Sequence, residues 1–130
     1  MAPPATFVVA GSVRPGDQFS ASVSYAGGSS YTLKISDSTE GWSHTLTKSL
    51  SSGQRSSAEV IVEAPCCTAG GGILPLADFG KASFTNAEVN GSPIGNASPI
   101  KIVMASGGTK KDSISALSGG TNFTATWLHK

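Results

Sequence analysis

Hydrophobic and polar residues alternate with a period of two along much of the chain. The alternation is clearest in four stretches, which are residues 19–25, 31–35, 42–46 and 123–127. In the first, Phe19, Ala21, Val23 and Tyr25 alternate with serines. Because successive side chains of a β-strand point to opposite faces, this pattern is typical of strands with one core face and one more polar face. No window of about a dozen residues has apolar residues at the helical spacing i, i+3, i+4 and i+7.

Glycine-rich and proline-rich turns separate these stretches. Gly27-Gly28, Gly107-Gly108 and Gly119-Gly120 have the composition of hairpin turns. Alternation and turns together predict strands near residues 6–10, 18–25, 31–36, 42–50, 58–64, 73–78, 82–89, 100–105, 112–117 and 121–128. Many short strands with regular turns favour a sandwich or a barrel. We therefore predict an all-β fold, an antiparallel β-sandwich that forms a single domain over residues 1–130.

Composition narrows the classes of function. The formal net charge is +1 and 13% of residues are charged, without a basic patch or acidic tail, so nothing indicates a nucleic-acid or membrane partner. Low charge suits an extracellular protein that works in acid, because few ion pairs are lost when carboxylates are protonated. We expect a secreted protein whose signal peptide lies outside this sequence, since the first residues lack basic and apolar signal regions.

The two cysteines, Cys66 and Cys67, are adjacent. Two interpretations stay open: a strained vicinal disulfide, or two thiols that are free or paired with another molecule. Disulfide geometry favours the second, because bonded cysteines usually have Cα atoms farther apart than neighbouring residues allow. A Cys-Cys pair alone is not a zinc signature, and His44 and His129 have no partner motif. We therefore expect no metal ion and no cofactor.

The segment from Ala58 to Pro65 carries the most informative side chains. In a strand, Glu59, Ile61 and Glu63 would share one face, with the two carboxylates ~13 Å apart at ~3.3 Å per residue. That separation is too long for a shared proton and exceeds the roughly 5–9 Å between the carboxyl groups of glycosidases. Either one glutamate works with a different group, or both lie on a solvated strand face. The pattern alone favours the solvated face.

Three segments resemble motifs of the glutamic peptidases, the eqolisin or G1 family. Residues 58–63 read Ala-Glu-Val-Ile-Val-Glu and resemble the family's Ala-Glu-aromatic-Ile-Val/Ile-Glu strand. Residues 74–80 read Leu-Pro-Leu-Ala-Asp-Phe-Gly and resemble its Val-Pro-Phe-Ala-Asp-Phe-Gly segment, and the Phe-Thr-Asn-Ala motif follows at residues 84–87. The resemblance covers nearly all of the chain, in order, and corresponds to the second, C-terminal half of the family's domain.

The resemblance implies a concanavalin-like jelly roll in which a substrate protein or peptide lies across a concave sheet. It implies that Glu63 is catalytic and that the enzyme is an acid endopeptidase. The carboxyl group of Glu63 would activate water and exchange protons with the scissile amide, with Glu59 and Ile61 as substrate-binding neighbours. In the family, a glutamine on a neighbouring strand helps to bind the water and to stabilise the oxyanion.

The sequence departs from the family pattern in two ways. Val60 stands where the family has an aromatic residue. The family's catalytic glutamine belongs to the first half of its domain, and Gln18 and Gln54 lie in turn-like contexts that do not match it. We therefore expect this chain alone to have little or no peptidase activity. The alternative function is a non-catalytic β-sandwich module, for binding or structure, that forms a homodimer through unpaired sheet edges.

Overall fold

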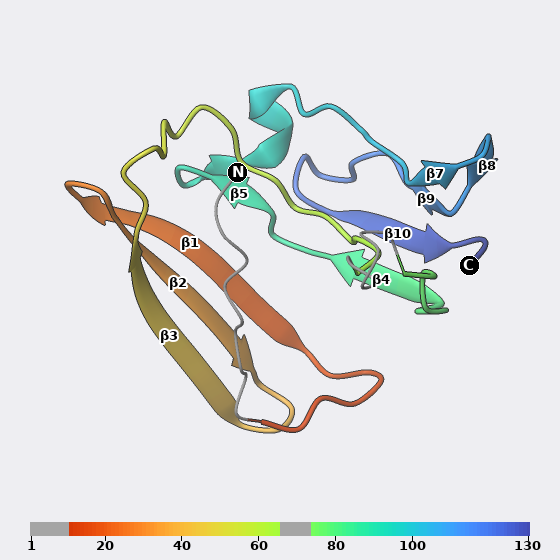
Figure 1. Ribbon diagram of the computed structural model, residues 1–130, viewed down its shortest axis with the longest axis horizontal. Helices are drawn as coiled ribbons and strands as arrows, with labels where there is room; N and C mark the ends of the chain where they lie inside the picture. The colour runs from red at the N-terminus through yellow and green to blue at the C-terminus, as the bar shows by residue number, and fades with distance from the viewer. Residues whose placement is uncertain (1–10, 66–73) are drawn as a thin grey trace. The chain divides into compact units, whose positions relative to one another are not determined.

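The computed structural model describes residues 11–65 and 74–130 (Figure 1). Contacts between Cα atoms divide the chain into two compact units, unit 1 (Met1–Ser56) and unit 2 (Ser57–Lys130), which are described separately. The regular elements of the described residues are antiparallel strands and one short 3-10 helix. No helix within these two described ranges is long and apolar enough to cross a membrane. The single domain over residues 1–130 stays a prediction.

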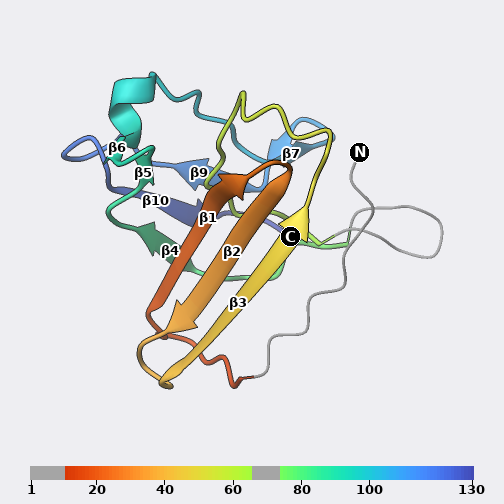
Figure 2. The same cartoon turned by 90° about the vertical axis from the view of Figure 1, so that its left-hand side faces the viewer.

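Unit 1 contains one antiparallel sheet in the order β1-β2-β3, whose strands lie side by side in Figure 2. The strands are β1 (Phe19–Gly27), β2 (Ser30–Asp37) and β3 (Trp42–Ser49). They confirm the strands predicted over 18–25, 31–36 and 42–50. The two strands β1 and β2 are joined by a tight turn in which Gly28 has a φ of 61°, a left-handed conformation that glycine adopts without steric cost.

Aromatic pairs occupy both ends of one face of this sheet. The rings of Tyr25 and Tyr31, which are opposite one another on β1 and β2, lie 5.5 Å apart between centroids. At the other end, Phe19 meets the edge of Trp42 at 5.9 Å. The indole N–H of Trp42 also donates to the backbone oxygen of Ser12 at 2.9 Å. The alternation read from the sequence thus places its apolar residues on a single face, as predicted.

Asp37 ends β2 with a buried carboxylate, of which only 1% is exposed. Its Oδ1 accepts hydrogen bonds from the backbone N–H groups of Thr39 at 2.8 Å and Glu40 at 3.1 Å. Its Oδ2 is buried and has no hydrogen-bond partner in the part of the chain that the structure describes. One carboxylate oxygen therefore fixes the turn into β3, while desolvation of the other oxygen is uncompensated there.

Replacing Asp37 by alanine should lower the free energy of unfolding by about 1–3 kcal/mol, because two part-buried turn N–H groups lose their acceptor. Asp37→Asn keeps an acceptor oxygen and removes the buried charge, so it should cost clearly less. Urea unfolding followed by circular dichroism measures both variants. Equal losses for the two variants would show that the charge, rather than the acceptor, stabilises the turn.

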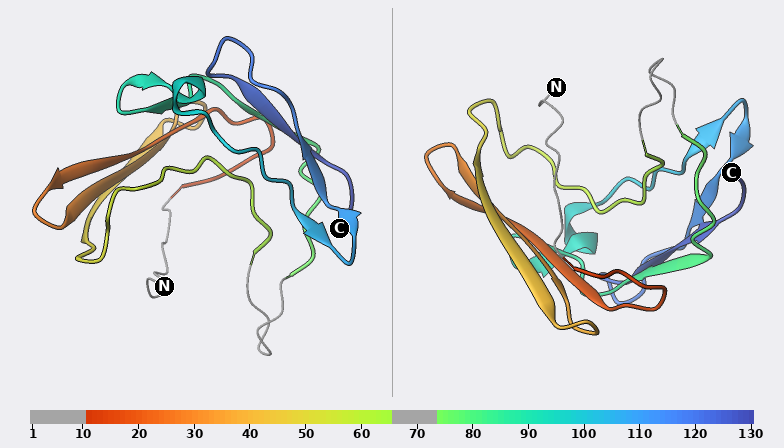
Figure 3. Two further views of the ribbon diagram at one scale, coloured as in Figure 1. Left: turned by 90° about the horizontal axis from the view of Figure 1, so that it is seen from above. Right: turned by 60° about the horizontal axis from the view of Figure 1, so that its bottom comes forward.

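Unit 2 contains a three-stranded sheet, two hairpins and a 3-10 helix, seen from two further sides in Figure 3. The sheet has the order β4-β10-β9, formed by β4 (Lys81–Phe84), β10 (Phe123–Trp127) and β9 (Asp112–Ile114). The hairpins are β5 (Glu88–Val89) with β6 (Ser92–Pro93), and β7 (Ala105–Ser106) with β8 (Thr109–Lys110). The helix η1 (Ile94–Ala97) follows β6 directly.

The sheet of unit 2 has one apolar face, built around the fully buried Ala125 at the middle of β10. Phe123 and Phe84 are cross-strand partners, and their rings stack with centroids 4.7 Å apart. Trp127 lies on the same face, since it is two residues from Ala125, and its indole N–H donates to the backbone oxygen of Leu76 at 3.4 Å. The central strand therefore holds residues around position 76 against the sheet.

Both hairpins of unit 2 have left-handed residues at their turns. Asn90 and Gly91 have φ values of 53° and 72°, and Gly107 and Gly108 have 57° and 80°. Positive φ at both central positions defines the type I′ turn, which matches the twist of two antiparallel strands. The hairpin turn predicted at Gly107-Gly108 is therefore confirmed.

Several predicted strands of unit 2 are wrong or shorter than predicted. Residues 58–64 and 74–78 form no strand, and only the end of the stretch 100–105 pairs, in β7. The stretch 82–89 is interrupted at Asn86, whose φ of 54° is left-handed and ends the extended conformation. The strands predicted over 112–117 and 121–128 form at 112–114 and 123–127. The stretch 6–10, residue 73 and the Cys66–Cys67 pair lie outside the described residues.

Residues 58–64 alternate as a strand would, yet they form no strand. Side chains still alternate there, since Val62 and Ala64 are half-buried while Ile61 and Glu63 are exposed. A strand also requires a neighbouring backbone to pair its N–H and C=O groups. Within the described ranges, these residues have no ladder partner. The pattern predicted the exposure of Glu59, Ile61 and Glu63, but Val60, expected on the opposite face, is also 37% exposed, and the strand pairing is absent.

Candidate active site

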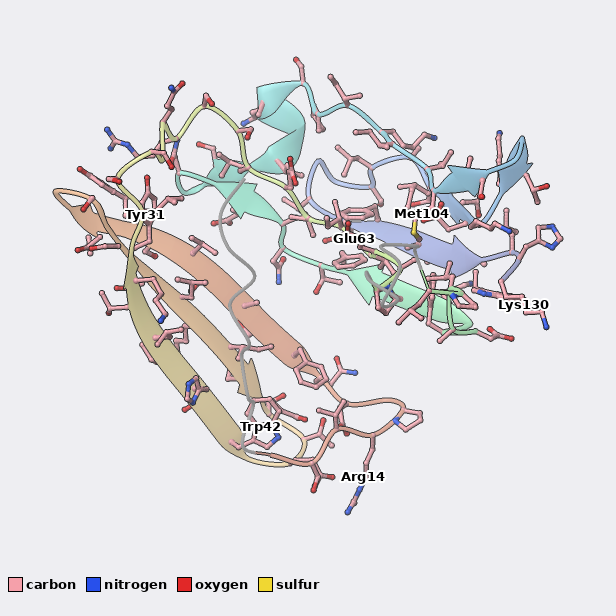
Figure 4. All side chains as sticks on the ribbon, in the orientation of Figure 1. Arg14, Tyr31, Trp42, Glu63, Met104 and Lys130 are labelled. Carbon is pink, nitrogen blue, oxygen red and sulfur yellow. The ribbon has the colours of Figure 1, made fainter. Side chains whose placement is uncertain are left out.

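Glu63 lines a cavity of about 680 Å³ in unit 2, and its side chain is exposed to solvent. The rest of the wall combines apolar side chains, small residues and two lysines: Ala64, Leu74, Pro75, Leu76, Met104, Ala105, Ser106, Lys111 and Lys130. Figure 4 shows Glu63 and Met104 near one another and Lys130 beyond the end of β10. The cavity lining thus combines a carboxyl group with apolar residues and two lysines.

One wall of the cavity is the segment around Leu76. Leu76 is 6% exposed, and its backbone oxygen receives the hydrogen bond from Trp127. At the start of this wall, the backbone N–H of Leu74 donates to the oxygen of Pro65 at 3.0 Å. Because Pro65 is only two residues beyond Glu63, this bond ties the segment that carries Glu63 to the apolar wall.

The opposite part of the lining comes from the base of the β7–β8 hairpin. Lys111 donates its backbone N–H to the oxygen of Met104 at 2.8 Å. The N–H of Met104 donates in turn to Oδ1 of Asp112 at 2.7 Å, and Asp112 is only 2% exposed. Both backbone polar groups of Met104 are therefore satisfied, which fixes the residue at the cavity wall.

Asp112→Ala should lower the free energy of unfolding by about 1–3 kcal/mol, because the part-buried N–H of Met104 loses its acceptor. Local opening should also increase, so the amide of Met104 should exchange its hydrogen faster than amides in β10. Native-state hydrogen exchange followed by NMR measures both effects. Asp112→Asn, which keeps an acceptor oxygen, is the matched control and should protect Met104 better than alanine does. Unchanged protection at Met104 in the alanine variant would contradict this role for Asp112.

The lysine side chains of the cavity are partly fixed. Nζ of Lys111 donates to the backbone oxygen of Lys130 at 2.6 Å, so its ammonium group stays at the wall. A carboxyl group can accept and return a proton, and an apolar wall can contact the side chain of a bound peptide. The arrangement is thus suited to a polypeptide ligand with a reacting group near Glu63. No group of three or more metal-ligating side chains occurs among residues 11–65 and 74–130.

The structure separates the three site residues predicted from the sequence. Glu63 lines the cavity, whereas Glu59 and Ile61 do not; Glu59 is exposed, and Ile61 is 59% exposed. The roles of all three stay predictions. In unit 1, the side-chain amide of Gln18 donates to the backbone oxygen of Gly16 at 3.2 Å, and Gln54 is exposed.

Sequence reasoning did not identify Met104, Lys111 or Lys130 as cavity residues. A signal for the first two was present, because a two-residue turn at Gly107-Gly108 pairs 105–106 with 109–110 and so brings residues 104 and 111 together. Nothing in the pattern indicated Lys130, which is close to these residues only through the path of β10.

Comparison with known proteins identifies the class of protein. Residues 1–127 match the model of the Peptidase A4 family, the family of glutamic peptidases or eqolisins, and the chain belongs to this family. It is therefore a protease-like protein of the glutamic peptidase type, a family whose substrates are proteins or peptides. The family resemblance read from the sequence is confirmed.

A solved structure gives a particular relative. The chain is similar to aspergilloglutamic peptidase from Aspergillus niger, with a TM-score of 0.73 and 26% sequence identity over 89% of this chain and 69% of that one. The predicted fold class is confirmed, since the strands form antiparallel sheets and resemble the β-sandwich of that peptidase. A comparison with curated protein sequences gives no match.

Proposed function

We propose that this chain supplies the catalytic carboxyl group, that of Glu63, to an acid endopeptidase of the glutamic type. The observation that supports the proposal most directly is the position of Glu63 in a cavity with an apolar wall. The match between residues 58–63 and the family's glutamate motif adds to it, as does membership of the Peptidase A4 family. Glu59 and Ile61, which precede Glu63 on the same segment and lie outside the cavity, are proposed to bind the substrate beyond it.

In the proposed reaction, the Glu63 carboxylate removes a proton from water as the water oxygen attacks the scissile carbonyl carbon. The resulting tetrahedral centre collapses, the C–N bond breaks, and Glu63 returns its proton to the leaving amine. An amide N–H donor aimed at the oxyanion would lower the barrier by about 3–4 kcal/mol. The side-chain amide of Gln18 already donates to the backbone oxygen of Gly16. We therefore propose that the donor to the oxyanion is a glutamine outside residues 1–130.

The proposal is tested with a protein substrate in the acidic range that it assigns to the enzyme, at about pH 3–4. The first sample is the 130-residue chain alone, for which we expect little or no cleavage that depends on Glu63. The second is the same chain joined to the part of aspergilloglutamic peptidase that it does not cover, for which we expect cleavage. A folded hybrid without cleavage would contradict the peptidase proposal. Glu63-dependent cleavage by the chain alone would contradict only its inactivity.

Secretion and an acidic working environment belong to the same proposal. A charged-residue content of 13% leaves few ion pairs to lose in acid. Within the described residues a single salt bridge is formed, between Arg14 and the Glu40 carboxylate at 3.1 Å, which agrees with this expectation. Retention of the circular-dichroism spectrum from about pH 7 down to about pH 3, where most carboxylates are protonated, would support it.

A second candidate function is a non-catalytic module that self-associates through sheet edges. It is favoured by one observation, which is that all nine residues of β1 are exposed at the end of a sheet. This candidate predicts oligomers whether or not the hybrid enzyme cleaves its substrate.

A further inference from the structure

Strand β1 is a long sheet edge whose own residues carry no charge. The guanidinium group of Arg55 lies over the ring of Tyr25, 4.0 Å from its centroid. Strand β1 occupies one end of the order β1-β2-β3, and in the part of the chain that the structure describes it pairs with β2 alone. Its sequence, FSASVSYAG, has no charged residue and no proline, and Val23 is 71% exposed. Charged residues, prolines and short length are the features that usually protect an edge from pairing with another chain. Strand β1 has none of these three, and its one irregularity is a register shift between Tyr25 and Gly27 at its end.

The backbone groups that point away from β2 can be assigned by alternation. The N–H of Ser38 donates to the oxygen of Gln18 at 3.0 Å, so Gln18 directs its backbone groups toward β2. In an antiparallel ladder this direction alternates along the strand. The outward N–H and C=O groups of β1 therefore belong to its odd-numbered residues, which are Phe19, Ala21, Val23 and Tyr25.

We propose that β1 pairs antiparallel with β1 of a second copy of this chain, around a two-fold axis at Ser22. In this register Phe19 is opposite Tyr25 of the second copy, and Ala21 is opposite Val23. All outward-directed residues then pair with one another. An axis at Ala21 would instead set Tyr25 against Asp17, outside the strand, and an axis at Val23 would set Phe19 against Gly27, the last residue of the strand.

A second copy fits this edge better than a charged partner does. Like charges directly opposite one another destabilise a strand pair, and β1 presents none to its own copy. The two-fold register also places apolar residues opposite apolar residues and serines opposite serines. The apolar face of the β1-β2-β3 sheet would therefore continue across six strands. Edge pairing buries less than about 1,200 Å², the size class of weak and transient interfaces.

Disulfide trapping tests the register. In a Cys66→Ser, Cys67→Ser background, Ser22→Cys places two cysteines in a non-hydrogen-bonded pair with Cα atoms about 4.5 Å apart, within disulfide range. The matched control, Ser24→Cys, leaves its two cysteines about 13 Å apart. Under mild oxidation we expect Ser22→Cys to form a covalent dimer at least about tenfold faster than Ser24→Cys. Equal rates, or no dimer from either variant, would overturn the proposal.

Charge substitution tests the same pairing without a covalent bond. Ser22 is opposite Lys34 on β2, so Ser22→Glu gains an opposite-charge neighbour within its own sheet but meets another glutamate across the two-fold axis. Ser24→Glu adds the same charge opposite Ser20 of the second copy. Sedimentation equilibrium should show dimers for the unmodified chain and for Ser24→Glu, and monomers for Ser22→Glu.

Two results would count against a second copy as the occupant of the edge. One is an unmodified chain that stays monomeric at about 1 mM, a concentration at which even a weak interface associates. The other is a Ser22→Cys variant that couples as readily to an unrelated extended peptide carrying one cysteine, which would make the edge a general peptide site. The proposal does not depend on Glu63, since it concerns β1 alone. A Glu63→Gln chain should therefore dimerise as the unmodified chain does.

Discussion

Glu63→Gln should reduce kcat/KM of the hybrid peptidase by about 10²–10⁴-fold, the usual contribution of a positioned general acid–base group. Glutamine has nearly the same shape as glutamate, but it can neither remove a proton from water nor deliver one to the leaving amine. The loss should appear mainly in kcat, because the cavity and its apolar wall are retained. Initial rates of peptide cleavage over a range of substrate concentrations separate the two constants.

Glu88→Gln is the matched control for this experiment. Glu88 lies in the same unit, on β5, is exposed like Glu63, and does not line the cavity. The same chemical change there should leave kcat/KM within about twofold, as is usual for a surface substitution away from a site. A Glu63→Gln hybrid that keeps its full kcat would remove Glu63 from the proposed mechanism, and a large effect of Glu88→Gln would show that the assay reports stability instead.

The sheet of unit 1 could be predicted from the sequence because each of its strands pairs with the next strand along the chain. Residues 19–49 contain three alternating stretches joined by short turns, so each strand finds its partner a few residues away. Side-chain alternation then places the apolar residues on one face and sets the register. Prediction and structure differ there by only one or two residues at the strand ends.

Unit 2 was less predictable because its pairing is not local. Strand β10 lies between β4 and β9, and β4 is about 40 residues earlier in the chain. No pattern within a short stretch of sequence can therefore predict which strands pair in this sheet. The same limit applies to the site. The motif at residues 58–63 pointed to Glu63, whereas Met104, Lys111 and Lys130 join it in the cavity through the hairpin and the path of β10. Residues that meet only through tertiary structure leave no spacing to detect.

Trp127→Ala should be the most destabilising single change among those considered for unit 2, with a loss of about 3 kcal/mol in the free energy of unfolding. Large aromatic residues cost 3–5 kcal/mol when truncated in a core, and Trp127 is half-buried rather than fully buried, so the lower end of the range is expected. Its N–H also donates to Leu76, which would be left with an unpaired backbone oxygen. Urea unfolding measures this loss, provided that the free energy of unfolding depends on urea concentration equally steeply in the two proteins.

Trp127→Phe distinguishes the two contributions, because phenylalanine keeps an aromatic ring on the apolar face but has no N–H donor. It should cost about 1 kcal/mol, the typical net value of one hydrogen bond. If both variants lose the same free energy, the bond to Leu76 rather than ring burial holds this wall in place. Since Leu76 and Glu63 line the same cavity, the alanine variant of the hybrid should also raise KM while still folded, and the phenylalanine variant should do so less. A folded Trp127→Ala hybrid with unchanged KM would show that the wall beside Glu63 does not contact the substrate.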